Sequence, residues 1–185
     1  MKKVLWGSVL VMLSMNISVG NGTLGLLPDF VGYILMISGT NELLKKESSA
    51  FPVLRSVDII LKALAVGSAV AYVLDLLGIG LVSSSVEGFI WMVLVTAGDC
   101  YCWKKVIESI GRLEESYGKD FNSKLLTTAW WIYLVSGILS IAGTWINGAV
   151  LLSIIIVLTL TAQLYFIVQM YKCQKQYEMA QADRK

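Results

Sequence analysis

The sequence predicts an all-α membrane protein, a bundle of six spans arranged as three helical hairpins, and three observations lead to this fold class. First, 56% of the 185 residues are hydrophobic, only 15% are charged, and the mean hydropathy is +0.70; soluble domains are roughly 45–50% apolar and about 25% charged. Second, several apolar runs are longer than a core helix needs. Third, the lysines and arginines gather at alternate ends of these runs. At about 20 residues a span, we expect a single integral membrane domain over residues 1–185 and no sizeable soluble domain.

Charges and turn residues divide the chain into six apolar segments. The uncharged stretch 125–171 would extend about 70 Å as one helix, more than twice the ~30 Å of bilayer hydrocarbon. It must therefore fold back, and residues 143–148, with two glycines and an asparagine, form the turn-like cluster inside it. The predicted spans are about 4–20, 24–44, 57–78, 85–104, 124–143 and 148–171.

The cations predict an orientation. When six spans are drawn, every lysine and arginine falls on one side of the membrane and the opposite connections carry none. Because lysine and arginine near span ends are retained in the cytoplasm, the pattern predicts a bacterial-type plasma-membrane protein with both termini cytoplasmic. The cations are Lys2, Lys3, Lys45, Lys46, Arg55, Lys62, Lys104, Lys105, Arg112, Lys119, Lys124, Lys172, Lys175, Arg184 and Lys185.

The first segment has an alternative interpretation. Lys2 and Lys3 precede an apolar stretch that ends near the small residues Ser18 and Gly20, and this pattern also fits a cleaved signal peptide, which would leave five spans. The uncleaved interpretation preserves three complete hairpins, and we favour it.

The hairpins also hint at an internal repeat. Asp29 lies near the start of the second span and Glu87 near the start of the fourth. Each span ends in a pair of lysines, and the distance along the sequence from the acid to the lysines is similar in both. Duplication and shared membrane topology explain this match equally well, since inverted or parallel repeats are common in membrane folds.

Asp29 and Glu87 both fall at predicted helix starts, where a carboxylate meets the positive end of the helix dipole. Asp29 follows Pro28, a residue that the first helical turn tolerates, and Glu87 lies three residues after Ser84, the spacing of a capping box. We therefore favour a structural role for both acids over a functional one.

Asp75 is less easily explained, because it lies near the carboxyl end of the third span, where the helix dipole disfavours an anion. No cation lies on that side of the membrane in the predicted topology. Hydration at the interface is the favoured interpretation, and a proton or cation site is the alternative.

Asp99 lies within the fourth span, about one turn inside the cytoplasmic boundary. Lys62 falls at a similar depth on the third span, so we expect an interhelical ion pair between them. Arg55, Asp58 and Lys62 also share one helix face at i+3 and i+4 spacing. A structural cluster of ion pairs is favoured, with a proton relay or substrate site as the alternative.

Aromatic and small residues complete the pattern inside the membrane. Trp91, Trp130, Trp131 and Tyr133 lie deep enough to line a pocket for an apolar or cationic solute, although helix packing or lipid contact is the commoner reason for such positions. Small residues at every fourth position of the third span predict that it is central in the bundle. These residues are Ala63, Gly67 and Ala71, and Ala65 and Ala69 repeat the spacing on another face.

The chain offers no recognisable catalytic or metal-binding pattern. It contains no histidine and three cysteines, Cys100, Cys102 and Cys173, all at cytoplasmic span ends where thiols stay reduced. The side chains of a Cys-x-Cys pair on a helix point about 200° apart, which is poor geometry for a metal chelate. We expect no catalytic residue, no metal site, no cofactor and no enzymatic activity, and the scattered cations indicate no nucleic-acid binding.

Two helices are expected to continue into the cytoplasm. The fourth span extends from Lys104 to Tyr117, where Gly118 ends it, and the tail after Lys172 forms a second extension. The two extensions either pack on each other or offer a docking site for a protein partner or anionic lipid at residues 104–117. The apolar stripe of the first extension comprises Val106, Ile107, Ile110, Leu113 and Tyr117.

One segment carries a resemblance. Gly25-Leu26-Leu27-Pro28-Asp29-Phe30-Val31-Gly32-Tyr33 resembles a stretch found in small multi-pass bacterial membrane proteins of uncharacterised function, and this likeness implies no activity or site. In size and span count the chain is also similar to the substrate-binding subunits of energy-coupling-factor vitamin transporters. Its first span, however, lacks the Ala-x-x-x-Ala pattern with which those subunits dock their partner, so the likeness is one of shape.

Two classes of function follow from these observations. The first is a non-enzymatic accessory or structural membrane subunit, which acts through helix packing and its cytoplasmic extensions. The alternative is a solute-binding or transport module for a small cationic or apolar substrate, with Asp75, Asp99 and Lys62 as its ionisable residues and the deep aromatic residues as its lining. The scarcity of proline, with Pro28 and Pro52 alone, argues against a transporter built from broken helices.

Overall fold

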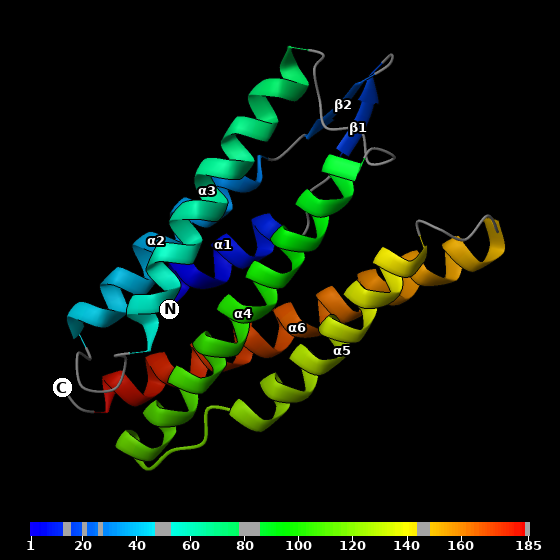
Figure 1. Cartoon of the computed structure of the whole chain (residues 1–185). Helices are drawn as coiled ribbons and strands as arrows, with labels where there is room; N and C mark the ends of the chain where they lie inside the picture. Colours follow the sequence, from blue (N-terminus) through cyan, green and yellow to red (C-terminus); the bar gives the residue numbers. More distant parts are fainter. Residues whose placement is uncertain are drawn as a thin grey trace. The chain divides into compact units, whose positions relative to one another are not determined.

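In the residues that it describes, the computed structural model has six α-helices and one short β-hairpin (Figure 1). It describes residues 1–12, 16–19, 22–25, 28–46, 53–77, 86–143 and 149–183. The elements in chain order are α1 (Lys2–Met12), β1 (Asn16–Val19), β2 (Gly22–Gly25), α2 (Asp29–Lys46), α3 (Leu54–Leu76), α4 (Val86–Tyr117), α5 (Ser123–Gly143) and α6 (Ala149–Ala182).

The chain divides into two compact units, a division that the hydropathy pattern did not indicate. The first unit, Met1–Cys102, holds α1, the β-hairpin, α2, α3 and the beginning of α4. The second, Trp103–Lys185, holds the rest of α4 together with α5 and α6. Helix α4 is therefore shared by both units.

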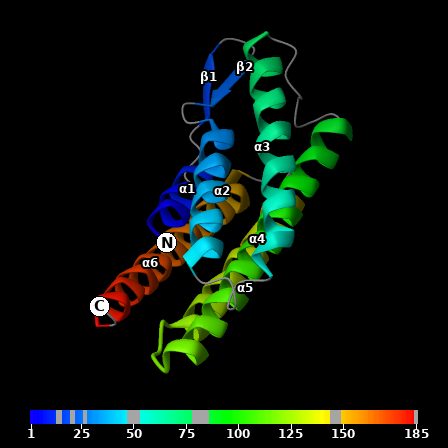
Figure 2. The ribbon, with the colours of Figure 1, turned by 90° about the vertical axis from the view of Figure 1, so that its left-hand side faces the viewer.

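In the first unit, α1 and α2 pack against each other at unusually close range (Figure 2). Three glycines make this approach possible. A Cβ atom on Gly7 would lie 2.6 Å from the carbonyl oxygen of Gly32, and one on Gly39 would lie 2.7 Å from the backbone nitrogen of Val4. Both distances are shorter than van der Waals contact with the backbone, so this helix pair requires glycine at its interface.

The β-hairpin follows α1 and was not predicted. Strands β1 and β2 pair antiparallel, with Val19 opposite Gly22 and Asn16 opposite Gly25, and β2 packs against α3. The first predicted span, 4–20, therefore differs from the structure: its helix ends at Met12, and residues Asn16–Val19 form a β-strand. Only the two residues Gly20 and Asn21 separate the strands, a length and composition typical of a tight hairpin.

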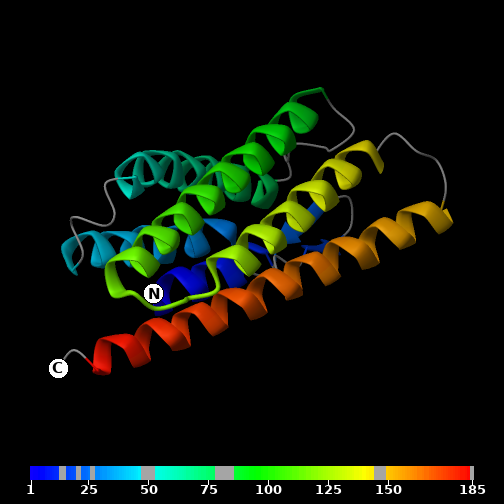
Figure 3. The same cartoon turned by 90° about the horizontal axis from the view of Figure 1, so that it is seen from below.

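The predicted second span, 24–44, begins too early, because Gly22–Gly25 form β2 and α2 begins only at Asp29; the boundaries of the later helices agree closely with the predicted segments. Helix α3 covers most of the predicted span 57–78, and α4 continues to Tyr117 as expected. Gly118 has φ +61°, a backbone conformation that glycine adopts without strain, so the predicted end of the helix is confirmed. Helices α5 and α6 pack side by side (Figure 3). In the sequence they are separated at the predicted break, residues 143–148. The structure of residues 144–148 lies outside the described part of the chain.

The core of the second unit is formed by large side chains from all three of its helices. Trp103 of α4 contacts Phe166 of α6 edge-to-face, with ring centroids 5.1 Å apart, and both are almost completely buried. Further toward the ends of α4 and α6, Tyr117, Phe121 and Tyr177 form a three-ring cluster. These contacts join the parts of α4 and α6 that extend beyond the apolar segments.

Three helices in the described part of the chain, not six, are long and apolar enough to cross a membrane. They are α3, α5 and the greater part of α6, Ser153–Ala182. Helix α1, with 11 residues, is too short by itself, and α2 carries charges at both ends of its 18 residues. The count of six spans is thus not reproduced by helix length and composition, whereas a membrane location is plausible.

Candidate functional site

Asp99, one of the predicted ionisable residues, lies in a buried polar contact inside the first unit. Its side chain on α4 is only 7% exposed, and the hydroxyl of Tyr33 on α2 donates a hydrogen bond to Oδ1 at 2.9 Å. Tyr33 itself is 1% exposed. A buried carboxylate is costly unless it accepts hydrogen bonds, so Tyr33 supplies a physical reason why α4 tolerates an acid here.

Asp29 lies near the same contact. It begins α2 one turn before Tyr33, which confirms the predicted helix start, and its negative charge acts electrostatically on Asp99. Two carboxylates and one phenol therefore lie near one another between the start of α2 and the middle of α4. Sequence analysis missed Tyr33, although it stands four residues after Asp29 and hence on the same helix face.

The expected ion pair between Lys62 and Asp99 is wrong. Lys62 binds Asp58 on its own helix, with Nζ 2.5 Å from Oδ2, and its side chain is 59% exposed. Asp58 also accepts a hydrogen bond from the amide of Asn41 at 3.4 Å. The i,i+4 partner on α3 is available without any tertiary rearrangement, which explains why it is preferred to an acid on another helix.

Asp75 lies in the last turn of α3 and is half-buried. No hydrogen bond or ion pair of its carboxylate occurs within the described residues, and residues 78–85, which follow in the chain, lie outside them. On α3, Lys62 and Asp75 are separated by thirteen positions, about 20 Å at ~1.5 Å per residue. The two residues therefore lie too far apart on one helix to form a joint site.

Trp91 packs on a helix of its own unit. A Cβ atom placed on Gly67 of α3 would lie only 2.2 Å from Cη2 of Trp91, so the indole ring occupies the space that a side chain at position 67 would need. Ala63 is exposed, and Ala71 is half-buried. The small-residue stripe predicted for α3 thus accommodates an aromatic ring at Gly67, and helix packing explains the position of Trp91.

The other predicted lining residues belong to the second unit. Trp130 is 8% exposed and packs edge-to-face on Trp131, with centroids 4.9 Å apart, while Trp131 is 56% exposed. Tyr133 contacts Phe166 at 6.2 Å between ring centroids. These rings belong to the second unit, whereas Asp75, Asp99 and Lys62 belong to the first.

The extension 104–117 packs its apolar stripe inside the second unit. Val106, Ile107, Ile110 and Leu113 are each at most 6% exposed, which favours packing within the chain over docking of a partner on this stripe. The turn after α4 is held by Glu114, whose carboxylate accepts hydrogen bonds from three groups of the turn. These are the backbone N–H of Phe121 at 2.8 Å, the backbone N–H of Ser123 at 2.8 Å and the hydroxyl of Ser123.

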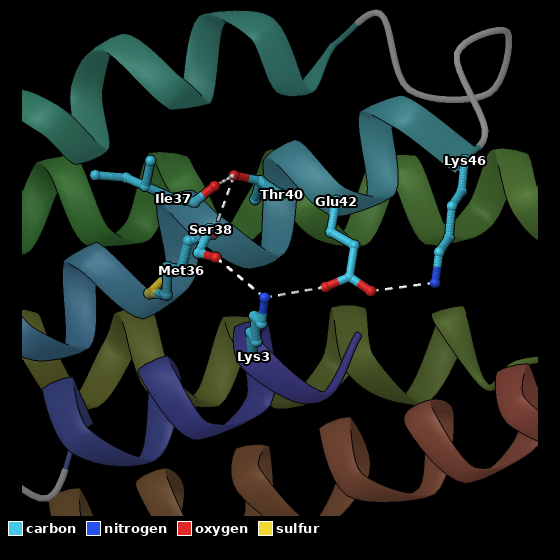
Figure 4. A network of polar contacts seen from close by, with 7 residues as sticks. All are labelled: Lys3, Met36, Ile37, Ser38, Thr40, Glu42 and Lys46. Atoms are coloured by element: carbon cyan, nitrogen blue, oxygen red, sulfur yellow. Dashed lines mark hydrogen bonds and ion pairs between the residues drawn. The ribbon is translucent and has the colours of Figure 1, made fainter.

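A second polar network ties α1 to α2 at the end of the first unit that carries its lysines (Figure 4). Lys3 donates to the hydroxyl of Ser38 at 3.3 Å and lies 3.4 Å from the carboxylate of Glu42. Lys46 donates to the other oxygen of Glu42 at 3.1 Å. All of these charges are exposed, so they orient the helix ends more than they stabilise the fold.

The three cysteines lie on α4 and α6. Cys100, Cys102 and Cys173 are buried and form no disulfide bond within the described residues. Among the described residues, no group of three or more histidine, cysteine, aspartate or glutamate side chains could hold a metal ion. The predicted capping partner of Glu87, Ser84, lies outside the described residues, while Glu87 itself stands in the first turn of α4.

No protein-family model, curated protein or solved structure matches the chain.

Proposed function

We propose that this protein is a non-enzymatic integral membrane subunit, which acts as an accessory or structural component of a membrane assembly. One observation carries this proposal: the charged and aromatic residues suited to a solute site are used separately, in contacts that stabilise helix packing. Asp99 binds Tyr33, Lys62 binds Asp58, and Trp91 packs on Gly67. A solute site needs such groups to converge on one cavity.

We also propose that the chain crosses a bacterial plasma membrane six times, with both termini in the cytoplasm. Helix α4 has 32 residues, about 48 Å of helix, so its apolar first part can cross the hydrocarbon while its second part extends beyond it. The first hairpin comprises α1, the paired strands and α2. Because α1 alone is too short to cross, the strands complete this crossing toward the outer interface, where water satisfies their open edges. The one-sided distribution of lysine and arginine supports this topology.

The partner of such a subunit would contact the exposed face of the cytoplasmic extension. Arg112 and Glu115 are exposed on α4, three residues apart and hence neighbours on one helix face. A partner that recognises this face would use polar contacts, since the apolar stripe of the same extension is already buried.

A solute-binding or transport module is the second candidate, and the proximity of Asp29, Tyr33 and Asp99 favours it. Acids within membrane-spanning segments are the usual place for a proton or cation. Under this alternative, Asp99→Asn and Asp75→Asn should abolish retention of the solute, whereas Asp120→Asn in the exposed turn should not.

Native mass spectrometry of the protein, extracted gently from its own membrane, tests the two candidates. The accessory role predicts a stoichiometric protein partner that is lost when the charges of the extension are reversed in the double variant Arg112→Glu, Glu115→Lys. Retention of a small molecule by the wild-type chain, lost in Asp99→Asn but not in Asp120→Asn, would contradict the accessory role and establish the alternative.

A further inference from the structure

A groove of about 260 Å³ opens between α4 and α5 in the second unit. Its walls include Lys104 and Gly111 from α4, and Thr127, Trp130 and Trp131 from α5. Gly111 leaves the floor of the groove open, because a Cβ atom added there would meet nothing within 4 Å. The groove is thus large enough for a polar headgroup and combines one basic end with an aromatic wall.

The groove wall carries one lysine and one glutamate, Lys104 and Glu108, and only the glutamate is in an ion pair within the described part of the chain. The ammonium group of Lys104 lies 5.8 Å from the ring centroid of Trp130, a cation–π contact, and Lys104 makes no ion pair within the described residues. The acid on the groove wall, Glu108, is compensated by Lys105, whose Nζ lies 2.8 Å from its carboxylate. The exposed cation of Lys104 therefore complements an anion.

The surroundings of the groove match the membrane–water boundary. Tryptophan is enriched at this boundary, where its ring contacts the acyl chains and its N–H the headgroups, and Trp131 is 56% exposed. Beyond Trp131, α5 presents the exposed apolar residues Ile132 and Val135. A ligand held at Lys104 can accordingly place a charged group in the groove and an apolar chain along α5.

We propose that this groove binds the headgroup of an anionic phospholipid, with the lipid phosphate at Lys104 and an acyl chain beside Trp131. The proposal rests on the membrane location of the chain but not on its role as an accessory subunit. Anionic lipids of the cytoplasmic leaflet contribute about 1 kcal/mol of attraction for each basic residue near the surface. The binding site is distinct from the exposed face of Arg112 and Glu115 that we assign to a protein partner.

Native mass spectrometry of the full chain in detergent, titrated with phosphatidylglycerol or phosphatidylcholine, tests the proposal. We expect the wild type to retain one phosphatidylglycerol at least fivefold more tightly than phosphatidylcholine. Lys104→Gln should weaken binding of phosphatidylglycerol about fivefold, the equivalent of ~1 kcal/mol. Gly111→Leu should abolish it by filling the groove, and Gly111→Ala serves as its matched control.

Two further controls make the result decisive. Lys175→Gln removes an exposed cation of α6 that lies outside the groove, and it should leave lipid binding unchanged. Equal affinity for the two lipids, an equal effect of Lys104→Gln and Lys175→Gln, or displacement of the lipid by inorganic phosphate at millimolar concentration would each overturn the proposal. Circular dichroism and carbonate extraction of every variant show whether folding and membrane insertion are retained, so that a lost membrane location is distinguished from a lost lipid site.

Discussion

The contact between Tyr33 and Asp99 shows how a single hydrogen bond places an acid inside a helix bundle. Removing the donor from a buried carboxylate costs roughly 1–3 kcal/mol, because the acceptor then lacks both protein and water partners. Asparagine at position 99 would still offer an oxygen to the Tyr33 hydroxyl. If Asp99 has a structural role, the fold therefore needs the Tyr33 hydroxyl more than it needs the acid at position 99. A proton site would instead need the acid itself.

We predict that Tyr33→Phe lowers the free energy of unfolding by about 1–3 kcal/mol, whereas Asp99→Asn has a much smaller effect. Thermal unfolding in detergent, followed by circular dichroism, measures both. Tyr171→Phe, a change at a residue that is 57% exposed, is the matched control and should leave the midpoint unchanged. A large loss in Asp99→Asn together with a neutral Tyr33→Phe would contradict this assignment.

Single-residue contacts were the least predictable part of the molecule. The sequence indicated that Asp99 needs a partner, but depth along two spans pointed to Lys62, and depth says nothing about the direction in which a side chain projects. Tyr33 donates instead, and Lys62 finds Asp58 one turn away. Only the tertiary arrangement of α2 and α4 decides between such partners.

At the scale of the helices, the closest packing occurs where glycine replaces a side chain. A Cβ atom at Gly32 would lie 2.8 Å from the carbonyl oxygen of Gly7, so α1 and α2 would have to separate to accept any larger residue. The rigid backbone on both sides leaves few other ways to relieve the overlap.

We predict that Gly32→Ala destabilises the protein by about 1–3 kcal/mol, the usual cost of overpacking a close interface. Gly111→Ala on α4, where a Cβ meets nothing within 4 Å, should be neutral or stabilising, because alanine has the higher helix propensity. Because both variants gain the same helix propensity, the difference between their thermal unfolding midpoints measures the cost of overpacking at Gly32. Equal effects of the two substitutions would show that the helices do not meet at Gly32.

Helices were predicted well from the sequence wherever charges or glycine mark their ends. The end of α4 before Gly118 and the break between α5 and α6 follow from local chemistry. The β-hairpin was missed because Gly20-Asn21 stands inside an apolar run, where hydropathy favours a continuous helix. The close contact of α1 and α2 was not predicted, although Gly32 and Gly39 lie two turns apart on one face of α2.

For the whole molecule, hydropathy and cation distribution predict a membrane protein with six spans. The structure supports a membrane location but not the number of spans. Among the described residues, three helices are by themselves long and apolar enough to cross a membrane. The six-span topology additionally requires α1, α2 and α4 to cross, and of these α4 contains Glu87 and Asp99 in its apolar part. The contact between Asp99 and Tyr33 lowers the cost of that crossing, since a buried acid with a hydrogen-bond donor is less unfavourable than an isolated one.

The central claim, a membrane protein in which α4 crosses between two opposite sides, is tested most directly by cysteine labelling in intact cells. Val86 is 72% exposed at the start of α4, and Asp120 is exposed in the turn after it. The three native cysteines are buried, so their background reaction with a membrane-impermeant maleimide should be low. The six-span topology predicts that Val86→Cys reacts in intact cells and that Asp120→Cys reacts only after permeabilisation. Labelling of both positions from the same side would show that α4 does not cross and would contradict the account.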